Sequence, residues 1–579
     1  MKVTKNNITI NISEGITEIT DLKRDVTWKL DNLTTQHDFV YDIRDDYIEI
    51  TLPVVEAKKV VMPSSFGVDG AEKTQYLLPI MQGMLWNGDG KPFESYRWEA
   101  GHHGFAMPMF AVLSDKGGYL YVAETMDNCG WVVSKADTGR TYCYNVQNAS
   151  VDGMRYERKA RIYFVDNTIT AAAKQYREYV KSQGRFITFK EKLEKRPELE
   201  RLFGTLMCYI GYCQDDIDYV ENFKRLKDYG FDKALVYPVR FNTYTEDFLM
   251  GGQPPVNLSD EEIAEIKALG YDVAPWTWIN EAIDDGTDVT RAMYRRMRDG
   301  NTKLSWQIDE FKYYNVCTTY MEEFYRKQRD GRFSGMTWDH FDVITCATNG
   351  ECYDKDHPAH KGEVLTKTED RKYLRGLLSA AGEAGGAVSS ESFNDAYSLE
   401  YDIGSVKAWA KYDNFIFKPI PLTMLVYHDS MIHSWWEVHS YNSSYFAADS
   451  SPFYQYGGGG YELQATMDAL YGCPPDVFPF GAQYCWTGNG KETMLYKFRF
   501  DDPETQLGLK IALPVAENHK KIGMLEMIDF TFLSDDYNLQ RTTFEDGTKI
   551  YANFSLSIKN HPECGAVLPK SWKCINAQS

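Results

Sequence analysis

The segment SGMTWDHFD (residues 334–342) places two acids after a short apolar run, and about fifty residues later the segment AVSSES (residues 387–392) places one acid after a second such run. Each segment predicts a short strand that ends on a carboxylate, with a helical segment between the two. A parallel barrel delivers such strand-end side chains to one rim. The two segments therefore predict a parallel α/β barrel whose rim carries a pair of acids.

The same alternation of strand and helix extends over about 300 residues around these segments. The predicted strands are short apolar runs and cover residues 203–212, 234–239, 273–279, 335–339 and 386–391, with 422–427 and 476–480 as candidates for the last two. A capping-box pattern from Ser259 to Glu262 opens one of the intervening helices. No glycine-rich phosphate loop follows the first strand, which disfavours a doubly wound sheet. We therefore expect a (β/α)8 TIM-like barrel over residues 196–525.

The regions on either side of the barrel alternate apolar and polar residues with a period of two, which is typical of antiparallel sheets. Residues 1 to about 165 contain such runs, for example Tyr47–Leu52, and a helix follows them. Beyond about Asp529 the alternation returns, with Asp546-Gly547 as a hairpin turn. These patterns predict an N-terminal β-sandwich with a linking helix over residues 1–195, and a small C-terminal β-domain over residues 526–579.

Charge and composition narrow the choice of ligand and compartment. The formal net charge of -20 would repel phosphate backbones and anionic lipids, so we expect neither a nucleic-acid nor a membrane partner. No run approaches membrane-spanning length, and the first residues lack the apolar core of a signal peptide. The 11 cysteines are dispersed without a C-x-x-C pair, which favours a reduced, cytoplasmic setting. Small neutral molecules are then the expected ligands.

Two acids at one rim suggest glycoside hydrolysis, in which one carboxylate meets the oxocarbenium-like centre and one carboxylic acid protonates the leaving oxygen. Asp339 and Glu391 end predicted strands and are the predicted catalytic pair. Asp342 could replace Asp339 as the nucleophile, but its place past the strand end favours hydrogen bonding around the substrate or a loop cap. Glu281 and Asp429 are further candidates.

Aromatic and polar residues after predicted strands are candidates for sugar binding. Trp278 ends the third strand and can form a platform for a sugar ring, and Trp435-Trp436 lies in a predicted loop. His428-Asp429 is a polar pair suited to sugar hydroxyls, although a structural hydrogen bond between the two side chains explains it equally well. Together these residues predict a closed, exo-acting pocket.

No cofactor and no metal are expected. One loop gathers possible oxygen and nitrogen ligands, but their spacing matches neither an EF-hand nor a zinc motif. The residues concerned are Asn349, Glu351, Asp354, Asp356, His357 and His360. The chain also lacks the G-x-S-x-G, H-E-x-x-H and P-loop patterns that would support esterase, protease or nucleotide chemistry.

Several short motifs resemble the retaining α-glycosidases of glycoside hydrolase families 101 and 129. They are MPMF at 107–110, YREY at 176–179, Trp338-Asp339, Glu391, VYHD at 426–429 and the tail from Gln540-Arg541-Thr542 to Asn553-Phe554. The resemblance implies that Asp339 is the nucleophile and Glu391 the acid/base, and that the substrate is α-linked N-acetylgalactosamine of mucin-type glycans.

The chain departs from that pattern in a longer stretch between the two acids, which includes residues 349–360. This departure bears on the identity of the sugar more than on the mechanism. Two alternatives stay open: an α-galactosidase or other α-exo-glycosidase on the same scaffold, and a carbohydrate-binding protein without catalysis.

Overall fold

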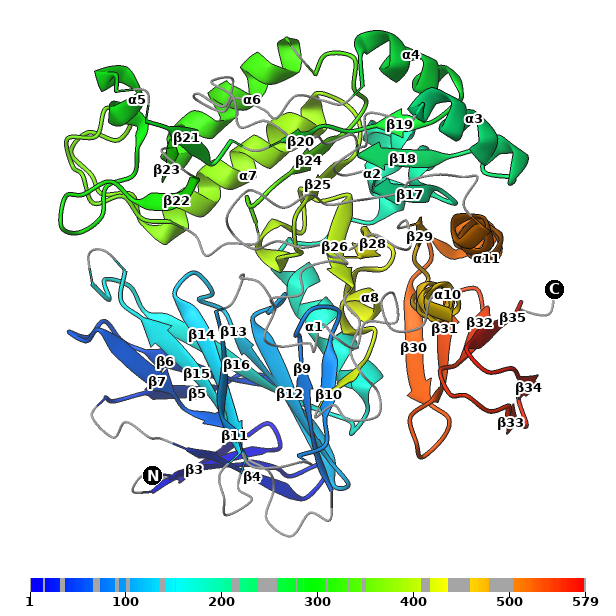
Figure 1. Cartoon of the computed structure of the whole chain (residues 1–579). Coiled ribbons are helices and arrows are strands. Elements are labelled where there is room, and N and C mark those ends of the chain that lie inside the picture. The colour runs from blue at the N-terminus through cyan, green and yellow to red at the C-terminus, as the bar shows by residue number, and fades with distance from the viewer. Residues whose placement is uncertain are drawn as a thin grey trace.

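A computed structural model describes most of the chain. The described residues are 2–13, 16–31, 37–65, 73–88, 93–99, 105–135, 141–150, 153–209, 218–237, 258–277, 279–284, 286–308, 311–331, 333–345, 350–407, 417–435, 459–477 and 503–576. Figure 1 shows N-terminal β-sheets in blue and cyan, a central region of parallel strands and helices in green and yellow, and C-terminal strands in orange and red.

The N-terminal region forms three antiparallel sheets, as its period-two pattern predicts. The first holds β1 (Lys2–Lys5), β2 (Ile8–Ser13), β3 (Ile16–Asp21), β4 (Val26–Asp31) and β8 (Ser64–Ser65). The second has the order β27 (Phe417–Pro419), β10 (Met84–Trp86), β9 (Thr74–Leu78), β12 (Met109–Ser114), β13 (Gly117–Ala123), β16 (Arg158–Val165), β6 (Tyr47–Leu52) and β5 (Val40–Ile43). The third holds β11 (Phe93–Glu99), β14 (Cys129–Lys135), β15 (Thr141–Asn148) and β7 (Lys59–Met62).

The buried faces of these sheets share one core. Phe110 of β12 packs edge-on against Trp131 of β14, with ring centroids 5.1 Å apart, so the second and third sheets lie face to face. The second sheet also receives β27 from the central part of the chain, which pairs antiparallel with β10. This strand ties the central region to the N-terminal sheets across more than three hundred residues of sequence.

The central region contains two parallel sheets. One has the order β19 (Asp272–Val273), β18 (Ala234–Tyr237), β17 (Leu206–Tyr209) and β29 (Asp476–Val477). The other has the order β20 (Trp276–Thr277), β24 (Asp339–Phe341), β25 (Val388–Ser390), β26 (Ile403–Lys407) and β28 (Ile432–Trp435). β19 and β20 follow one another directly in the chain, so the two sheets meet there.

The two parallel sheets also share a buried core that includes Met207, Leu235, Trp338, Ile403 and Ile432. A shared inner core of this kind is typical of a barrel interior. Within the described residues, however, no hydrogen-bonded pairing joins β28 to β29. The parallel strands and their order agree with the predicted (β/α)8 architecture, and the closure of the barrel stays a prediction.

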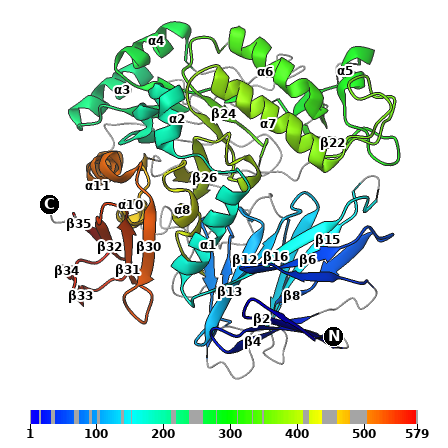
Figure 2. The ribbon, with the colours of Figure 1, turned by 180° about the vertical axis from the view of Figure 1, so that it is seen from behind.

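Helices cover the outer face of the parallel strands, which is seen from behind in Figure 2. The covering elements are α3 (Tyr219–Asp228), α4 (Asp260–Ala268), α6 (Met321–Asp330) and α7 (Lys367–Glu383). The predicted capping box of α4 is present, with Ser259 and Glu262 bonded reciprocally. A side sheet follows β20 and holds β21 (Glu281–Ile283), β23 (Phe311–Asn315) and β22 (Leu304–Ile308), with α5 (Asp288–Met293) and η3 (Thr318–Tyr320) beside it.

The remaining elements join the three regions. α1 (Ile169–Ser182) lies between the N-terminal sheets and the rest of the molecule (Figure 1) and packs against α8 (Leu422–Tyr427). The other connecting elements are α2 (Phe189–Lys195), η1 (Pro197–Leu202), η4 (Asp395–Tyr397), α10 (Gly459–Tyr471) and α11 (Pro503–Ile522). The C-terminal sheet holds β30 (Met527–Phe532), β31 (Leu539–Phe544), β32 (Lys549–Asn553) and β35 (Ser571–Ile575), beside the hairpin of β33 (Lys559–His561) and β34 (Gly565–Val567). Gly547 turns the predicted β31–β32 hairpin with φ 87°.

Two strand predictions and one loop prediction were wrong. Residues 422–427, predicted as a strand, form α8, and all six are buried. A short, fully buried apolar run fits a strand and a helix equally well, so its pattern could not decide. The predicted strand 335–339 begins later, at Asp339, and Trp435 ends β28 instead of lying in a loop. No helix among the described residues is long and apolar enough to cross a membrane.

Candidate active site

The side chains of β24 and β25 alternate between the inner and the outer face of their sheet. The two strands are parallel, with His340 opposite Ser389 and Phe341 opposite Ser390. His340 Nδ1 and Ser389 Oγ lie 2.8 Å apart on the inner face. Because alternate residues share a face, Asp342 and Glu391, two positions further along each strand, point the same way. The pairing therefore places these two acids side by side at the carboxyl end of the sheet.

Asp339 lies on the opposite face and packs against α6. Tyr325 of α6 donates a hydrogen bond to Asp339 Oδ2 at 3.0 Å, and Arg329 Nη1 lies 3.7 Å from Oδ1. The residue is 1% exposed, and burial raises the pKa of its carboxyl to about 6, against the opposing effects of Arg329 and Tyr325. The predicted position at an open strand end was wrong, because β24 begins at Asp339 and ends two residues later.

Glu391 occupies the position that its segment predicts. It follows β25 directly, its amide donates to the Phe341 carbonyl at 3.0 Å, and it is 6% exposed. Its Oε2 accepts a hydrogen bond from the Val343 amide at 3.0 Å. The carboxylate is thus held against the residue that follows Asp342 by a hydrogen bond from a neutral donor.

Asp342 is half-buried, and its amide donates to the Thr277 carbonyl of β20 at 2.8 Å. The residue after each acid has a left-handed backbone: Val343 has φ 55° and Ser392 has φ 58°. For a β-branched residue such as valine this conformation is strained, and such strain is concentrated at functional sites. Both strands therefore turn sharply just after their acid, so that the two carboxyl groups stay at the strand ends.

The predicted tryptophans lie largely outside the described residues, and the candidate acid Glu281 lies away from the strand ends. Trp278 and Trp436 lie outside the described residues, and only the backbone of Trp435, the last residue of β28, is described. Glu281 belongs to β21 of the side sheet, where it accepts a hydrogen bond from Ser305. It therefore lies in a different sheet from Asp342 and Glu391.

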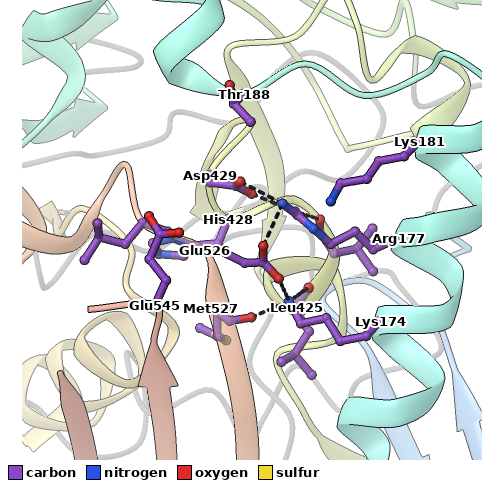
Figure 3. A network of polar contacts seen from close by, with 12 residues as sticks. Lys174, Arg177, Lys181, Thr188, Leu425, His428, Asp429, Glu526, Met527 and Glu545 are labelled. Atoms are coloured by element: carbon purple, nitrogen blue, oxygen red, sulfur yellow. Dashed lines mark hydrogen bonds and ion pairs between the residues drawn. The ribbon is translucent and has the colours of Figure 1, made fainter. Parts of the chain in front are cut away.

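His428 and Asp429 lie between helices and the C-terminal sheet rather than at a strand end. Arg177 of α1 donates to both carboxylate oxygens of Asp429 at 2.7 Å and forms an ion pair with Glu526 at 3.0 Å (Figure 3). His428 places Nδ1 2.6 Å from the Leu525 carbonyl and Nε2 2.8 Å from the Gly472 carbonyl. Every polar atom of the pair has a partner within the fold.

The predicted position of His428 and Asp429 at a strand end was therefore wrong, and their part in sugar binding stays a prediction. The apolar run before them is a buried helix, so it ends at a contact between α1, α8 and β30 instead of at the rim. The motif YREY at 176–179 meets the motif VYHD at 426–429 through this contact. The motifs that carried part of the resemblance thus hold the regions of the molecule together.

One charged group near the strand ends had no counterpart in the sequence analysis. Lys407 ends β26, is completely buried, and forms an ion pair with Asp468 of α10. Asp476 of β29 lies 4.0 Å from the same ammonium. The strand that carries Lys407, IGSVK, is short and lacks a period-two pattern, which explains why it was missed.

A cavity of about 360 Å³ opens at the other end of the parallel strands. Its lining comes from residues at or just before the strand starts, among them Leu235, Asp272, Trp338 and Ala387. In barrels of parallel strands the chemistry takes place at the carboxyl ends, and the opposite end serves stability. The acids at the strand ends, and not this cavity, are the candidate site.

Solved structures share this fold. The α-N-acetylgalactosaminidase NagBb of Bifidobacterium bifidum in its ligand-free form superposes with a TM-score of 0.75 at 17% identity, over 96% of this chain and 99% of that one. Its complex with Gal-NHAc-DNJ gives a TM-score of 0.76 at 16% identity over the whole of both chains. A family 36 α-galactosidase of Geobacillus stearothermophilus superposes with a TM-score of 0.50 at 10% identity, over the whole of this chain and 82% of that one.

No protein-family model matches the sequence, and no curated protein is similar to it. The resemblance predicted from short motifs is therefore confirmed at the level of the fold, which extends over nearly the whole chain.

Proposed function

We propose that the protein is a retaining, exo-acting α-glycosidase that releases terminal α-linked N-acetylgalactosamine. The observation that carries the proposal is the pairing of β24 with β25, which brings Asp342 and Glu391 to the ends of neighbouring strands. The chain has this pair within a fold that it shares, end to end, with an α-N-acetylgalactosaminidase solved with GalNAc bound. Two carboxyl groups at one site are what glycoside hydrolysis requires.

Glu391 is the proposed acid/base and Asp342 the proposed nucleophile. In the first step an Asp342 carboxylate oxygen forms a bond to the anomeric carbon, while Glu391 gives its proton to the departing oxygen. In the second step Glu391 takes a proton from a water molecule. The oxygen of this water forms a bond to the anomeric carbon, and the bond between that carbon and the Asp342 carboxylate breaks. The resemblance assigned the nucleophile to Asp339, but the contact of that side chain with α6 favours Asp342.

The tryptophans complete the proposed pocket. Trp278 follows Thr277, whose carbonyl accepts a hydrogen bond from the Asp342 amide, so in sequence it comes directly after a residue bonded to the proposed nucleophile. Trp435 ends β28, and Trp436 follows it. All three thus come directly at or after the ends of parallel strands, where flat apolar side chains can stack on a single sugar ring.

The test compares aryl α-N-acetylgalactosaminide with aryl α-galactoside, using the anomeric proton signals of the first product. We expect faster hydrolysis of the acetamido sugar and an α-configured first product. A β-configured first product would reject the retaining mechanism. Preference for the galactoside would favour the α-galactosidase alternative, sugar binding without turnover would favour the non-catalytic one, and cleavage of a blocked internal linkage would reject exo action.

A further inference from the structure

Three possible metal ligands converge beside η3, where the ring of His357 contacts Tyr320. Cys317 lies just before η3, and His357 and His360 lie in the loop that leads to α7. One ligand atom from each, the cysteine sulfur and a nitrogen of each histidine, lies within 4.8 Å of the other two. The loop spacing alone predicted no metal site. The sulfur that completes the group comes from a distant part of the chain, so no local motif could reveal it.

Both histidine rings present an unpaired nitrogen. His357 is 1% exposed, its Nδ1 accepts a hydrogen bond from the Ala359 amide at 3.3 Å, and its Nε2 has no hydrogen-bond partner among the described residues. His360 turns Nδ1 to the Glu363 carbonyl at 2.8 Å, and its buried Nε2 likewise lacks a partner in the described part of the chain. The two rings stack with centroids 4.5 Å apart. A buried nitrogen without a partner is costly unless something binds it.

Two buried sulfur atoms accept hydrogen bonds here. Cys317 packs beside Cys352, which also lies in the loop and is completely buried. Thr319 Oγ1 donates to Cys317 Sγ at 3.3 Å, and the Arg296 amide donates to Cys352 Sγ at 3.4 Å. A sulfur atom that accepts hydrogen bonds is stabilised as the thiolate, which is the form that binds metals.

We propose that Cys317, Cys352, His357 and His360 bind one zinc ion in a closed, structural site. Two sulfur and two imidazole donors form one of the common tetrahedral zinc sets, and they are poor ligands for calcium or magnesium. With every position taken by protein, the ion offers no site for substrate. It would fasten the loop from Gly350 to Thr366 to the end of β23, and so fix the start of α7. This inference is independent of the proposed enzymatic activity.

The experiment measures the metal in the full-length protein purified without chelator. Elemental analysis should find one zinc per chain. After exchange for cobalt, the protein should show the visible bands of a tetrahedral site and a thiolate-to-cobalt charge-transfer band. Cys317→Ser and His360→Asn should each lose most of the zinc, whereas Cys574→Ser, at a half-buried cysteine of β35, should retain it.

The cobalt spectrum is recorded on the unaltered protein, so poor folding of a variant does not obscure the result. Protein that takes up neither zinc nor cobalt would overturn the proposal. So would bound metal that survives both substitutions, or a disulfide between Cys317 and Cys352 found by peptide mapping without reductant. Since activity is not the readout, failure here leaves the glycosidase proposal untouched.

Discussion

Glu391 and Asp429 both follow short apolar runs, yet the structure uses them in opposite ways. Glu391 directly follows a parallel strand, and its carboxylate accepts a hydrogen bond from a neutral backbone amide. Asp429 follows a buried helix, and the guanidinium of Arg177 donates hydrogen bonds to both of its carboxylate oxygens. A carboxylate locked to a buried cation serves packing, because releasing it would leave a charge unpaired. The comparison teaches that the partner of an acid, more than its position after an apolar run, decides its role.

The largest effect should come from the acid beside Glu391. Asp342→Asn should lower kcat on an aryl α-N-acetylgalactosaminide by at least about a thousandfold, because the covalent step needs the carboxylate. Asp339→Asn, whose side chain faces α6, should reduce kcat far less. Denaturant unfolding of both variants controls for loss of structure. A comparable loss of kcat in a folded Asp339→Asn protein would return the nucleophile to Asp339.

Glu391→Gln should be selective for the leaving group. General acid catalysis contributes about 10²–10⁴-fold, so a substrate with a poorly acidic leaving group should lose roughly that much in rate. An activated aryl glycoside needs little protonation, and its first step should be nearly unaffected. The measurement is kcat/KM on both substrates. Equal losses on the two would argue against the acid/base role.

Asp429→Asn should act on stability and not on chemistry. The substitution breaks a buried bidentate pair, since the side chains of Arg177 and Asp429 are 3% and 10% exposed, and should lower the free energy of unfolding by about 3 kcal/mol. The activity per folded molecule should stay near wild type. Glu178→Gln on the same helix is the matched control, because its ion pair with Lys181 is exposed and should contribute little. A thousandfold drop in kcat for folded Asp429→Asn would place this residue in the site after all.

The smallest effect concerns the pH dependence of stability at Asp339. Burial raises its pKa in the folded state from 3.8 to about 6, so the folded protein binds this proton more tightly than the unfolded chain. The stability that this group contributes is therefore present below pH 3.8 and is lost as the pH rises from there through about 6. Relative to Asp339→Asn, the wild type should lose up to about 3 kcal/mol of unfolding free energy over this pH range.

Tyr325→Phe sharpens this comparison. The tyrosine hydroxyl stabilises the ionised carboxylate, so its removal should enlarge the loss of stability as the pH rises. Denaturant unfolding curves at several pH values measure how far the unfolding free energy of wild type differs from that of Asp339→Asn and from that of Tyr325→Phe. A flat difference between wild type and Asp339→Asn would show that this carboxyl is not held in a desolvated position.

Local patterns predicted the parallel strands as far as β25 and the place of Glu391 directly after it, because a short apolar run that ends on an acid is informative within a parallel α/β alternation. Asp339 was misplaced because the side-chain period of a strand is two. Asp339 lies three residues before Asp342. In an extended strand, side chains three residues apart point to opposite faces, so the two acids cannot share the inner face. His428 and Asp429 were misplaced because a buried six-residue run fits a helix as well as a strand. The group of Cys317, His357 and His360 could not be predicted, since the fold alone brings these residues together.

Chemical rescue with azide tests the pairing of Asp342 with Glu391 most directly. Asp342→Gly removes the proposed nucleophile, and azide entering in its place should attack the face opposite the leaving group and give a β-glycosyl azide. Glu391→Ala retains the nucleophile, so azide should instead open the covalent intermediate and give an α-glycosyl azide. Opposite configurations from the two variants are the predicted result. A β-glycosyl azide formed by Asp339→Gly, with none formed by Asp342→Gly, would contradict the account.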